Sequence, residues 1–162
     1  MTIESSSLAD LGWSSFFASQ LDPDEQARPV RAMAIHRDRI HVMGPGIDAL
    51  VLPFAVYPDD EEAAATVGDW LLLDPGTQRL RRLLDRRSLF KRRAAGSARR
   101  VQLIAGNVDT LFVVSSCNQD FSPARLERYL ALASEAEVTP VVVLTKADLA
   151  DDPAEFVLSL IH

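Results

Sequence analysis

Residues 30–84 contain five short, strand-like segments, each followed by a polar or turn-forming stretch. The segments read VRAMAI, RIHVM, IDALVLP, GDWLLLD and RLRRLL. The stretches between them include His36-Arg37-Asp38, Gly44-Pro45-Gly46 and Asp74-Pro75-Gly76. Apolar runs of this length, bounded by Gly, Pro and Asp, are typical of β-strands. Five strands so close in sequence predict a small closed or nearly closed barrel.

The oligonucleotide-binding fold (OB-fold) is the leading candidate for residues 29–84, because it is a five-stranded barrel with a nucleic-acid-binding face. An SH3-like barrel remains the alternative from pattern alone. Residues 1–28 are amphipathic, and they predict a helical turn or two packed on a neighbouring element. Their apolar positions are Leu8, Leu11, Trp13, Phe16, Phe17 and Leu21.

After residue 100 the sequence changes from short strand-like segments to longer apolar runs that flank a possible helix. VQLIA and TLFVVSS are apolar and rich in β-branched residues, as expected for strands buried on both faces of a parallel sheet. Ser122 and Pro123 can start a helix, and PVVVLT follows as another buried strand. We therefore interpret residues 101–162 as the first, incomplete part of an α/β domain built on a βαβ unit. In such units the functional loops lie at the carboxyl ends of the strands.

Charge is distributed unevenly along the chain. The net charge is −6, yet residues 79–100 hold ten basic side chains and one acid. We interpret residues 85–100, DRRSLFKRRAAGSARR, as a basic linker beside the barrel. A concentrated basic segment in an acidic protein favours a local polyanion contact, although a solvated hinge would look the same. The candidate RNA-binding residues are Arg86, Arg87, Lys91, Arg92 and Arg93.

Other features of the sequence narrow the class of protein. No run of about 18 apolar residues is present, so no membrane partner is expected. The N-terminus lacks the basic and apolar regions of a secretory signal, and Cys117 is the single cysteine. These observations predict a cytoplasmic protein without an internal disulfide. His36 and His41 lack further ligand residues nearby, so no metal site is expected in this chain.

The strand PVVVLT runs into Thr145-Lys146-Ala147-Asp148. An [N/T]-K-x-D loop after a buried strand can select guanine, because the Asp carboxylate accepts hydrogen bonds from both N1–H and the 2-amino group. Adenine offers neither donor, and losing such a contact costs on the order of 2–5 kcal/mol. Lys146 can lay its methylene stem over the base. The alternative is that Asp148 caps a helix and Lys146 is solvated.

Three stretches extend this pattern over residues 68–152. They are GDWLLLD, then RRSLFKRRAAG leading into VQLIAGNVDTLFVV, then ARLERYLALASEAEVTPVVVLTKADLADD. In order and spacing they resemble the ribosome small-subunit-dependent GTPase A family, a group of circularly permuted GTPases. The segment LGWSSFF and the predicted barrel resemble the N-terminal part of that family.

The resemblance implies an OB-fold followed by a GTPase domain whose guanine-specificity motif precedes its phosphate loop. It implies binding of GTP or GDP through Thr145, Lys146 and Asp148. It also implies GTP hydrolysis during late biogenesis of the small ribosomal subunit, with the subunit and its 16S-type rRNA as partners. Magnesium and a zinc-binding tail are expected for full-length members of the family.

This sequence departs from the family in what it lacks. It contains no G-x-x-x-x-G-K-[S/T] phosphate loop, no D-x-x-G magnesium motif and no Cys/His cluster. No catalytic residue and no ligand for magnesium or zinc is therefore expected here, and we interpret the chain as an N-terminal portion that is inactive in hydrolysis alone. A non-catalytic RNA- or ribosome-binding module, and an α/β enzyme that only mimics a GTPase, remain the alternatives.

Overall fold

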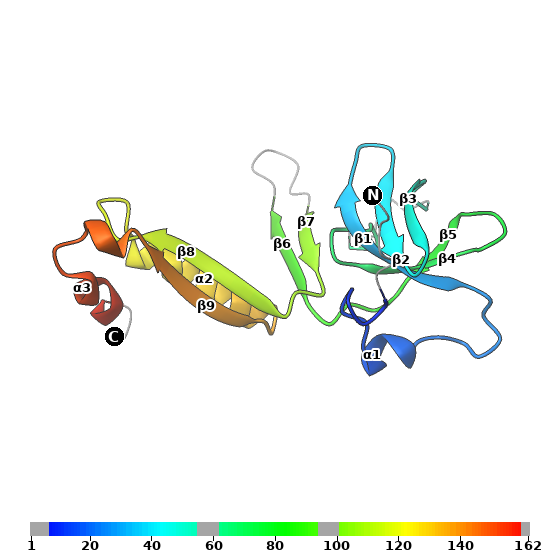
Figure 1. The fold of residues 1–162 in the computed structure, drawn as a ribbon, viewed down its shortest axis with the longest axis horizontal. Helices are drawn as coiled ribbons and strands as arrows, with labels where there is room; N and C mark the ends of the chain where they lie inside the picture. Colours follow the sequence, from blue (N-terminus) through cyan, green and yellow to red (C-terminus); the bar gives the residue numbers. More distant parts are fainter. Residues whose placement is uncertain (1–6, 55–61, 94–100, 160–162) are drawn as a thin grey trace. The chain divides into compact units, whose positions relative to one another are not determined.

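The computed structural model describes residues 7–54, 62–93 and 101–159, which divide into two units (Figure 1). The first unit comprises residues 1–107 and the second residues 108–162. No helix in the described ranges is long and apolar enough to cross a membrane.

The first unit is built on a five-stranded antiparallel sheet in the order β3-β2-β1-β4-β5. Its strands coincide with the five predicted from the sequence. They are β1 (Arg28–Ile35), β2 (Ile40–Gly44), β3 (Ile47–Val51), β4 (Trp70–Leu73) and β5 (Leu80–Leu83). The turn between β2 and β3 contains Gly46 with φ +70°, a left-handed conformation that glycine adopts without strain.

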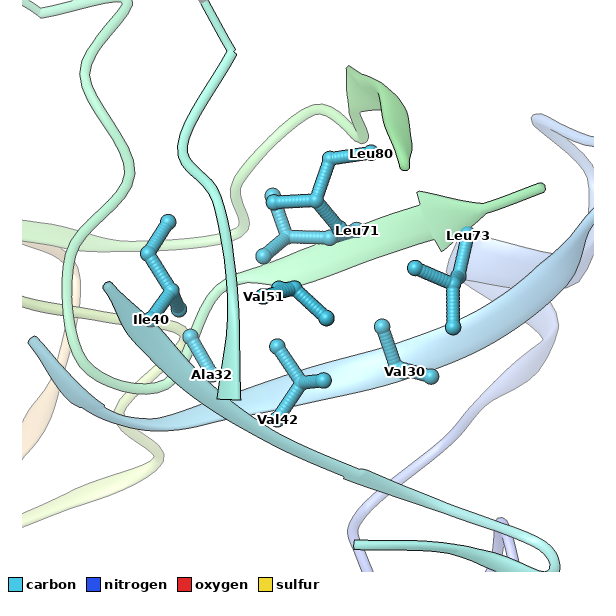
Figure 2. Packing of buried hydrophobic residues seen from close by; sticks show 8 residues of the cluster. All are labelled: Val30, Ala32, Ile40, Val42, Val51, Leu71, Leu73 and Leu80. Atoms are coloured by element: carbon cyan, nitrogen blue, oxygen red, sulfur yellow. The ribbon is translucent and has the colours of Figure 1, made fainter. Parts of the chain in front are cut away.

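One apolar core draws on all five strands (Figure 2). Val51 lies on the edge strand β3 and Leu80 on the opposite edge strand β5, yet both belong to the same buried cluster. The sheet therefore curves until its two edges share a core, as in an OB-fold. Within the described residues β3 and β5 form no ladder, so the barrel is OB-like but not closed.

The N-terminal segment packs on the other face of β4. Its helix α1 (Ser15–Ala18) places Phe17 in a second cluster with Leu11, Trp70 and Leu72. The ring of Trp13 meets that of Trp70 edge to face, with the centroids 4.7 Å apart. All four residues of β4 are fully buried as a result. The helical turn and its packing on a neighbouring element agree with the amphipathic pattern of residues 8–21.

Two further strands belong to the first unit: β6 (Leu89–Arg93) and β7 (Val101–Gly106). They pair antiparallel with each other, and we call them the β6–β7 ribbon. This corrects two interpretations made from the sequence. Residues 89–93 are a strand within the segment read as a linker, and VQLIA is not part of a parallel sheet. The basic side chains of β6 hide its strand character, which depends on pairing with β7; residues 94–100 lie outside the described ranges.

The second unit contains the predicted βαβ arrangement. Strands β8 (Thr110–Ser116) and β9 (Thr139–Thr145) run parallel, in a register from Thr110 opposite Thr139 to Ser116 opposite Thr145. Helix α2 (Pro123–Glu135) connects them, with Ser122 at its N-cap position and Pro123 at N1, although the Ser122 side chain makes no capping hydrogen bond. A 3₁₀ turn η1 (Ala147–Leu149) and helix α3 (Pro153–Leu158) follow.

Helix α2 packs on only one face of the β8–β9 pair. Leu126 and Ala133 of the helix are buried, as is Val113 of β8. On β8, Phe112 and Val114 point to the other face and remain 64% and 63% exposed. This parallel pair is therefore covered by protein on one side only within the described part of the chain.

Candidate functional site

The predicted guanine-reading loop lies at the carboxyl end of the parallel pair β8 and β9. Thr145 is the last residue of β9 and stands opposite Ser116 of β8. Its hydroxyl donates to the carbonyl oxygen of Ser115 at 3.3 Å, and the Cys117 N–H donates to the carbonyl oxygen of Thr145 at 2.9 Å. Thr145 therefore ties the start of the loop to the end of the neighbouring strand.

After Thr145 the chain reverses sharply. Lys146 adopts φ 57° and ψ 32°, the left-handed region that a residue with a side chain enters at a cost. This turn leads directly into η1, where the Leu149 N–H donates to the carbonyl oxygen of Lys146 at 3.1 Å. Asp148 lies in the middle of η1, two positions from the lysine.

Lys146 and Asp148 are both exposed. Within the described ranges neither side chain makes a hydrogen bond or an ion pair. Of the alternative reading, the part in which Asp148 caps a helix is not found, because Asp152 occupies the N-cap of α3 and accepts from the Ala154 N–H at 3.0 Å. Its other part, a solvated Lys146, agrees with the exposure of that side chain. The structure thus brings the three predicted residues into one loop and leaves a carboxylate and an ammonium group available to a ligand.

The basic candidates do not form a single group. Arg86 is 10% exposed and points inward, toward the fully buried carboxylate of Asp69. Its Nε and Nη2 donate to the two carboxylate oxygens at 2.8 and 2.7 Å. The same guanidinium donates to the carbonyl oxygens of Glu62 and Ala64 at 2.6 and 2.7 Å. With its donors used inside the protein, Arg86 is a structural residue in this arrangement and not a free phosphate contact.

Three of the other candidates are exposed on the first unit. The Arg87 backbone N–H donates to Oδ1 of Asn107 at 2.9 Å, which fixes its main chain. Lys91 forms an ion pair with Glu62, with both side chains 47% exposed. Arg92 donates from Nε to Oε1 of Gln102 at 2.9 Å across the ribbon. The side chain of Arg93 lies outside the described residues.

Successive side chains of a strand point to opposite faces, so the side chains of Lys91 and Arg92 lie on opposite faces of the ribbon. Their contacts are single and solvent-exposed, and exposed pairs of this kind contribute little to stability. A phosphate could therefore replace the carboxylate of Glu62 as the partner of Lys91, or the amide of Gln102 as the partner of Arg92.

Sequence reasoning missed Asp69 as a partner for the basic segment. The signal was present, since an acid stands at the start of an entirely apolar strand, in GDWLLLD. A carboxylate that is buried must be paired and hydrogen-bonded. Within the described ranges no group of three or more His, Cys, Asp and Glu side chains is arranged to hold a metal ion.

Comparisons with known proteins identify the family to which the chain is similar. A family model described as RsgA GTPase matches residues 83–160. A protein of Mesorhizobium japonicum named small ribosomal subunit biogenesis GTPase RsgA is 48% identical over 155 residues, which cover 94% of this chain and 43% of that protein. The chain is also 46% identical over 153 residues to a Vibrio parahaemolyticus protein named small ribosomal subunit biogenesis GTPase RsgA 2, covering 93% and 41% of the two chains.

Two solved structures have a similar fold. The crystal structure of YloQ, described as a circularly permuted GTPase, matches with a TM-score of 0.58 and 19% identity, over 86% of this chain and 48% of that one. YjeQ from Thermotoga maritima matches with the same TM-score and identity, over 82% and 46%. The chain thus spans less than half the length of each of these proteins.

Proposed function

Because the chain belongs to the RsgA GTPase family, we propose that it supplies the guanine-reading loop and an RNA-binding surface to a GTPase that acts in small ribosomal subunit biogenesis. The names of its relatives in Mesorhizobium and Vibrio support the ribosomal role. Its partners on this proposal are GTP or GDP, the small ribosomal subunit and its 16S-type rRNA, in the cytoplasm.

The observation that carries the nucleotide proposal is the carboxylate of Asp148, which has no partner among the described residues and lies just after the carboxyl end of two parallel strands. Guanine presents N1–H and the 2-amino group side by side, and one carboxylate can accept from both. Adenine presents an acceptor at N1 and no donor at C2, so it would leave the carboxylate without a partner. Lys146 can cover the base with its methylene stem while its ammonium group stays in water.

Hydrolysis needs parts that this sequence does not contain. A phosphate loop normally holds the β and γ phosphates with its backbone and its lysine, and Mg²⁺ is bound beside it. The sequence contains no G-x-x-x-x-G-K-[S/T] or D-x-x-G motif for these tasks, and no cluster in the described ranges is arranged to hold zinc. We therefore assign base recognition, and not phosphoryl transfer, to the residues of this chain.

RNA contact is assigned to the exposed basic side chains of the first unit, Arg87, Lys91 and Arg92, and to Arg93 by its place in the sequence. Neutralising phosphates releases counterions, which supplies most of the affinity for nucleic acid and makes it depend on salt. These side chains also raise a second candidate function, a purely RNA- or ribosome-binding module without nucleotide binding.

Nucleotide titration separates the two functions. Guanosine monophosphate and adenosine monophosphate are added to the isotope-labelled chain while amide signals of residues 145–150 are followed. We expect shifts with the guanine nucleotide only, and their loss in Asp148→Ala. The variant Asp148→Asn should instead prefer xanthosine monophosphate, because an amide can accept from N1–H and donate to the 2-oxo group. Equal shifts with both nucleotides, or none, would leave only the RNA-binding function.

A further inference from the structure

The end of the β6–β7 ribbon meets the turn before β4 with backbone against backbone. Gly68 has φ +90°, and a Cβ added to it would lie 2.2 Å from the carbonyl oxygen of Gly106. A Cβ added to Gly106 would lie 2.3 Å from Oδ1 of Asp69. Contacts this short leave no room for any side chain, so glycine is required at both positions.

Hydrogen bonds hold this contact together. The Gly106 N–H donates to the carbonyl oxygen of Val67 at 2.8 Å. The side-chain amide of Asn107 donates to the carbonyl oxygen of Gly68 at 3.2 Å. Arg31 of β1 donates to the carbonyl oxygens of Gly68 and Asn107 at 3.2 and 3.1 Å. The second strand of the ribbon is therefore fixed to the five-stranded sheet where it ends.

The approach to the first strand of the ribbon is fixed by the buried ion pair. Asp69 immediately precedes β4, and Arg86 lies three residues before β6. The bidentate geometry described above sets the direction in which the chain enters the ribbon. Asp69 also accepts from the Thr66 N–H at 2.7 Å, which holds the carboxylate itself in place.

We propose that Gly68, Asp69, Arg86, Gly106 and Asn107 form a joint that locks the ribbon to the OB-like sheet and so holds the exposed basic side chains of the ribbon in place for RNA. Arg86 is then a positioning residue and makes no phosphate contact. This inference rests on the proposed RNA binding. A locked ribbon loses less conformational freedom on binding than a mobile one, and so binds more tightly with the same contacts.

Salt dependence distinguishes a positioning residue from a contact. The slope of log affinity against log salt counts the phosphates that are neutralised, at about 0.7–0.9 per contact. Loss of the joint should weaken binding at every salt concentration without changing that slope. Loss of an arginine that contacts a phosphate should weaken binding and also flatten the slope by about 0.7–0.9.

The test measures binding of purified small-subunit rRNA to the full chain over a salt series. Gly106→Ala opens the joint without changing any charge, and Arg86→Gln removes its ion pair. We expect each to lower affinity about tenfold, a loss of about 1.4 kcal/mol, with the slope of the unaltered chain. Arg92→Ala is the matched control, expected to flatten the slope. A flattened slope in Arg86→Gln, or unchanged affinity in a folded Gly106→Ala, would overturn the inference.

Amide exchange in the unaltered chain tests the joint without any substitution. A two-stranded ribbon alone is marginally stable in water. If the joint locks it, the paired amides of β6 and β7 should exchange as slowly as those between β1 and β4. Ribbon amides that exchange much faster would overturn the proposal. If the ribbon is protected but the unaltered chain does not bind RNA, the proposed RNA-binding function is refuted. The joint then exists but has no role in RNA binding.

Discussion

Replacing Arg86 by alanine should destabilise the first unit strongly. The substitution leaves the carboxylate of Asp69, which is fully buried, with the Thr66 N–H as its remaining partner among the described residues, and it also deprives the carbonyls of Glu62 and Ala64 of a donor. Removing one partner of a buried ion pair typically costs about 3–5 kcal/mol. Domains of this size are stable by about 5–15 kcal/mol, so the first unit of the variant should lose a substantial part of its stability.

Urea unfolding followed by tryptophan fluorescence measures this cost. The two tryptophans of the chain, Trp13 and Trp70, both lie in the first unit, and their rings are in contact. The signal therefore reports the unfolding of that unit alone. Arg92→Ala is the matched control, because it removes an exposed arginine with one side-chain partner, and it should cost at most about 1 kcal/mol.

Combining the Arg86 and Asp69 substitutions should restore part of the lost stability. In Asp69→Ala with Arg86→Met no buried charge remains, and an apolar pair can replace a buried ion pair at little cost. The double variant should therefore be more stable than the sum of the single variants predicts. A cost below about 1 kcal/mol for Arg86→Ala would refute the reasoning, since it would mean that Asp69 finds water when its partner is gone.

Three other outcomes are expected. The purified chain should release no phosphate from GTP above buffer, because it has no phosphate loop; sustained release free of contaminating GTPases would contradict this. Hydrogen bonds from the Thr77 backbone and the Arg81 side chain lower the pKa of Asp74 from 3.8 to about 2, so Asp74→Asn should lower Tm at neutral pH, and that difference should disappear as the pH falls from about 4 through 2. Amide exchange should be faster in the second unit than in β1–β5, because Phe112 and Val114 leave one sheet face uncovered, and equally slow exchange throughout a monomer would show that this unit is self-sufficient.

The strands of the barrel could be predicted because two signals coincide there. Apolar runs mark β1 to β5, and Gly, Pro and Asp mark the turns between them. The parallel pair was predictable for a related reason, since TLFVVSS and PVVVLT are almost wholly apolar and flank an amphipathic helix. In each case the residues of the strand or helix themselves show the pattern, so the element can be predicted without knowing which distant segment it contacts.

The β6–β7 ribbon could not be predicted in the same way. Leu89 and Phe90 are followed by Lys91, Arg92 and Arg93, which give β6 no apolar periodicity. Its strand geometry comes from the ladder with β7 and from the joint, both of which involve residues distant in sequence. VQLIA, by contrast, is apolar enough for a buried parallel strand, and only its pairing shows that it belongs to an antiparallel ribbon.

The roles of the charged residues depend on whether a partner is already present. Asp152 caps α3, and Asp69 is paired with Arg86, so both carboxylates are used by the fold. The sequence alone does not distinguish the inward-pointing Arg86 from the exposed Arg87, because Asp69, the partner of Arg86, lies 17 residues earlier. Asp148 is the opposite case, an exposed acid beside Lys146 with no partner among the described residues. Lys146 adopts the left-handed conformation in the turn that follows β9. This exposed pair, without a partner among the described residues, is the one that we propose to bind guanine.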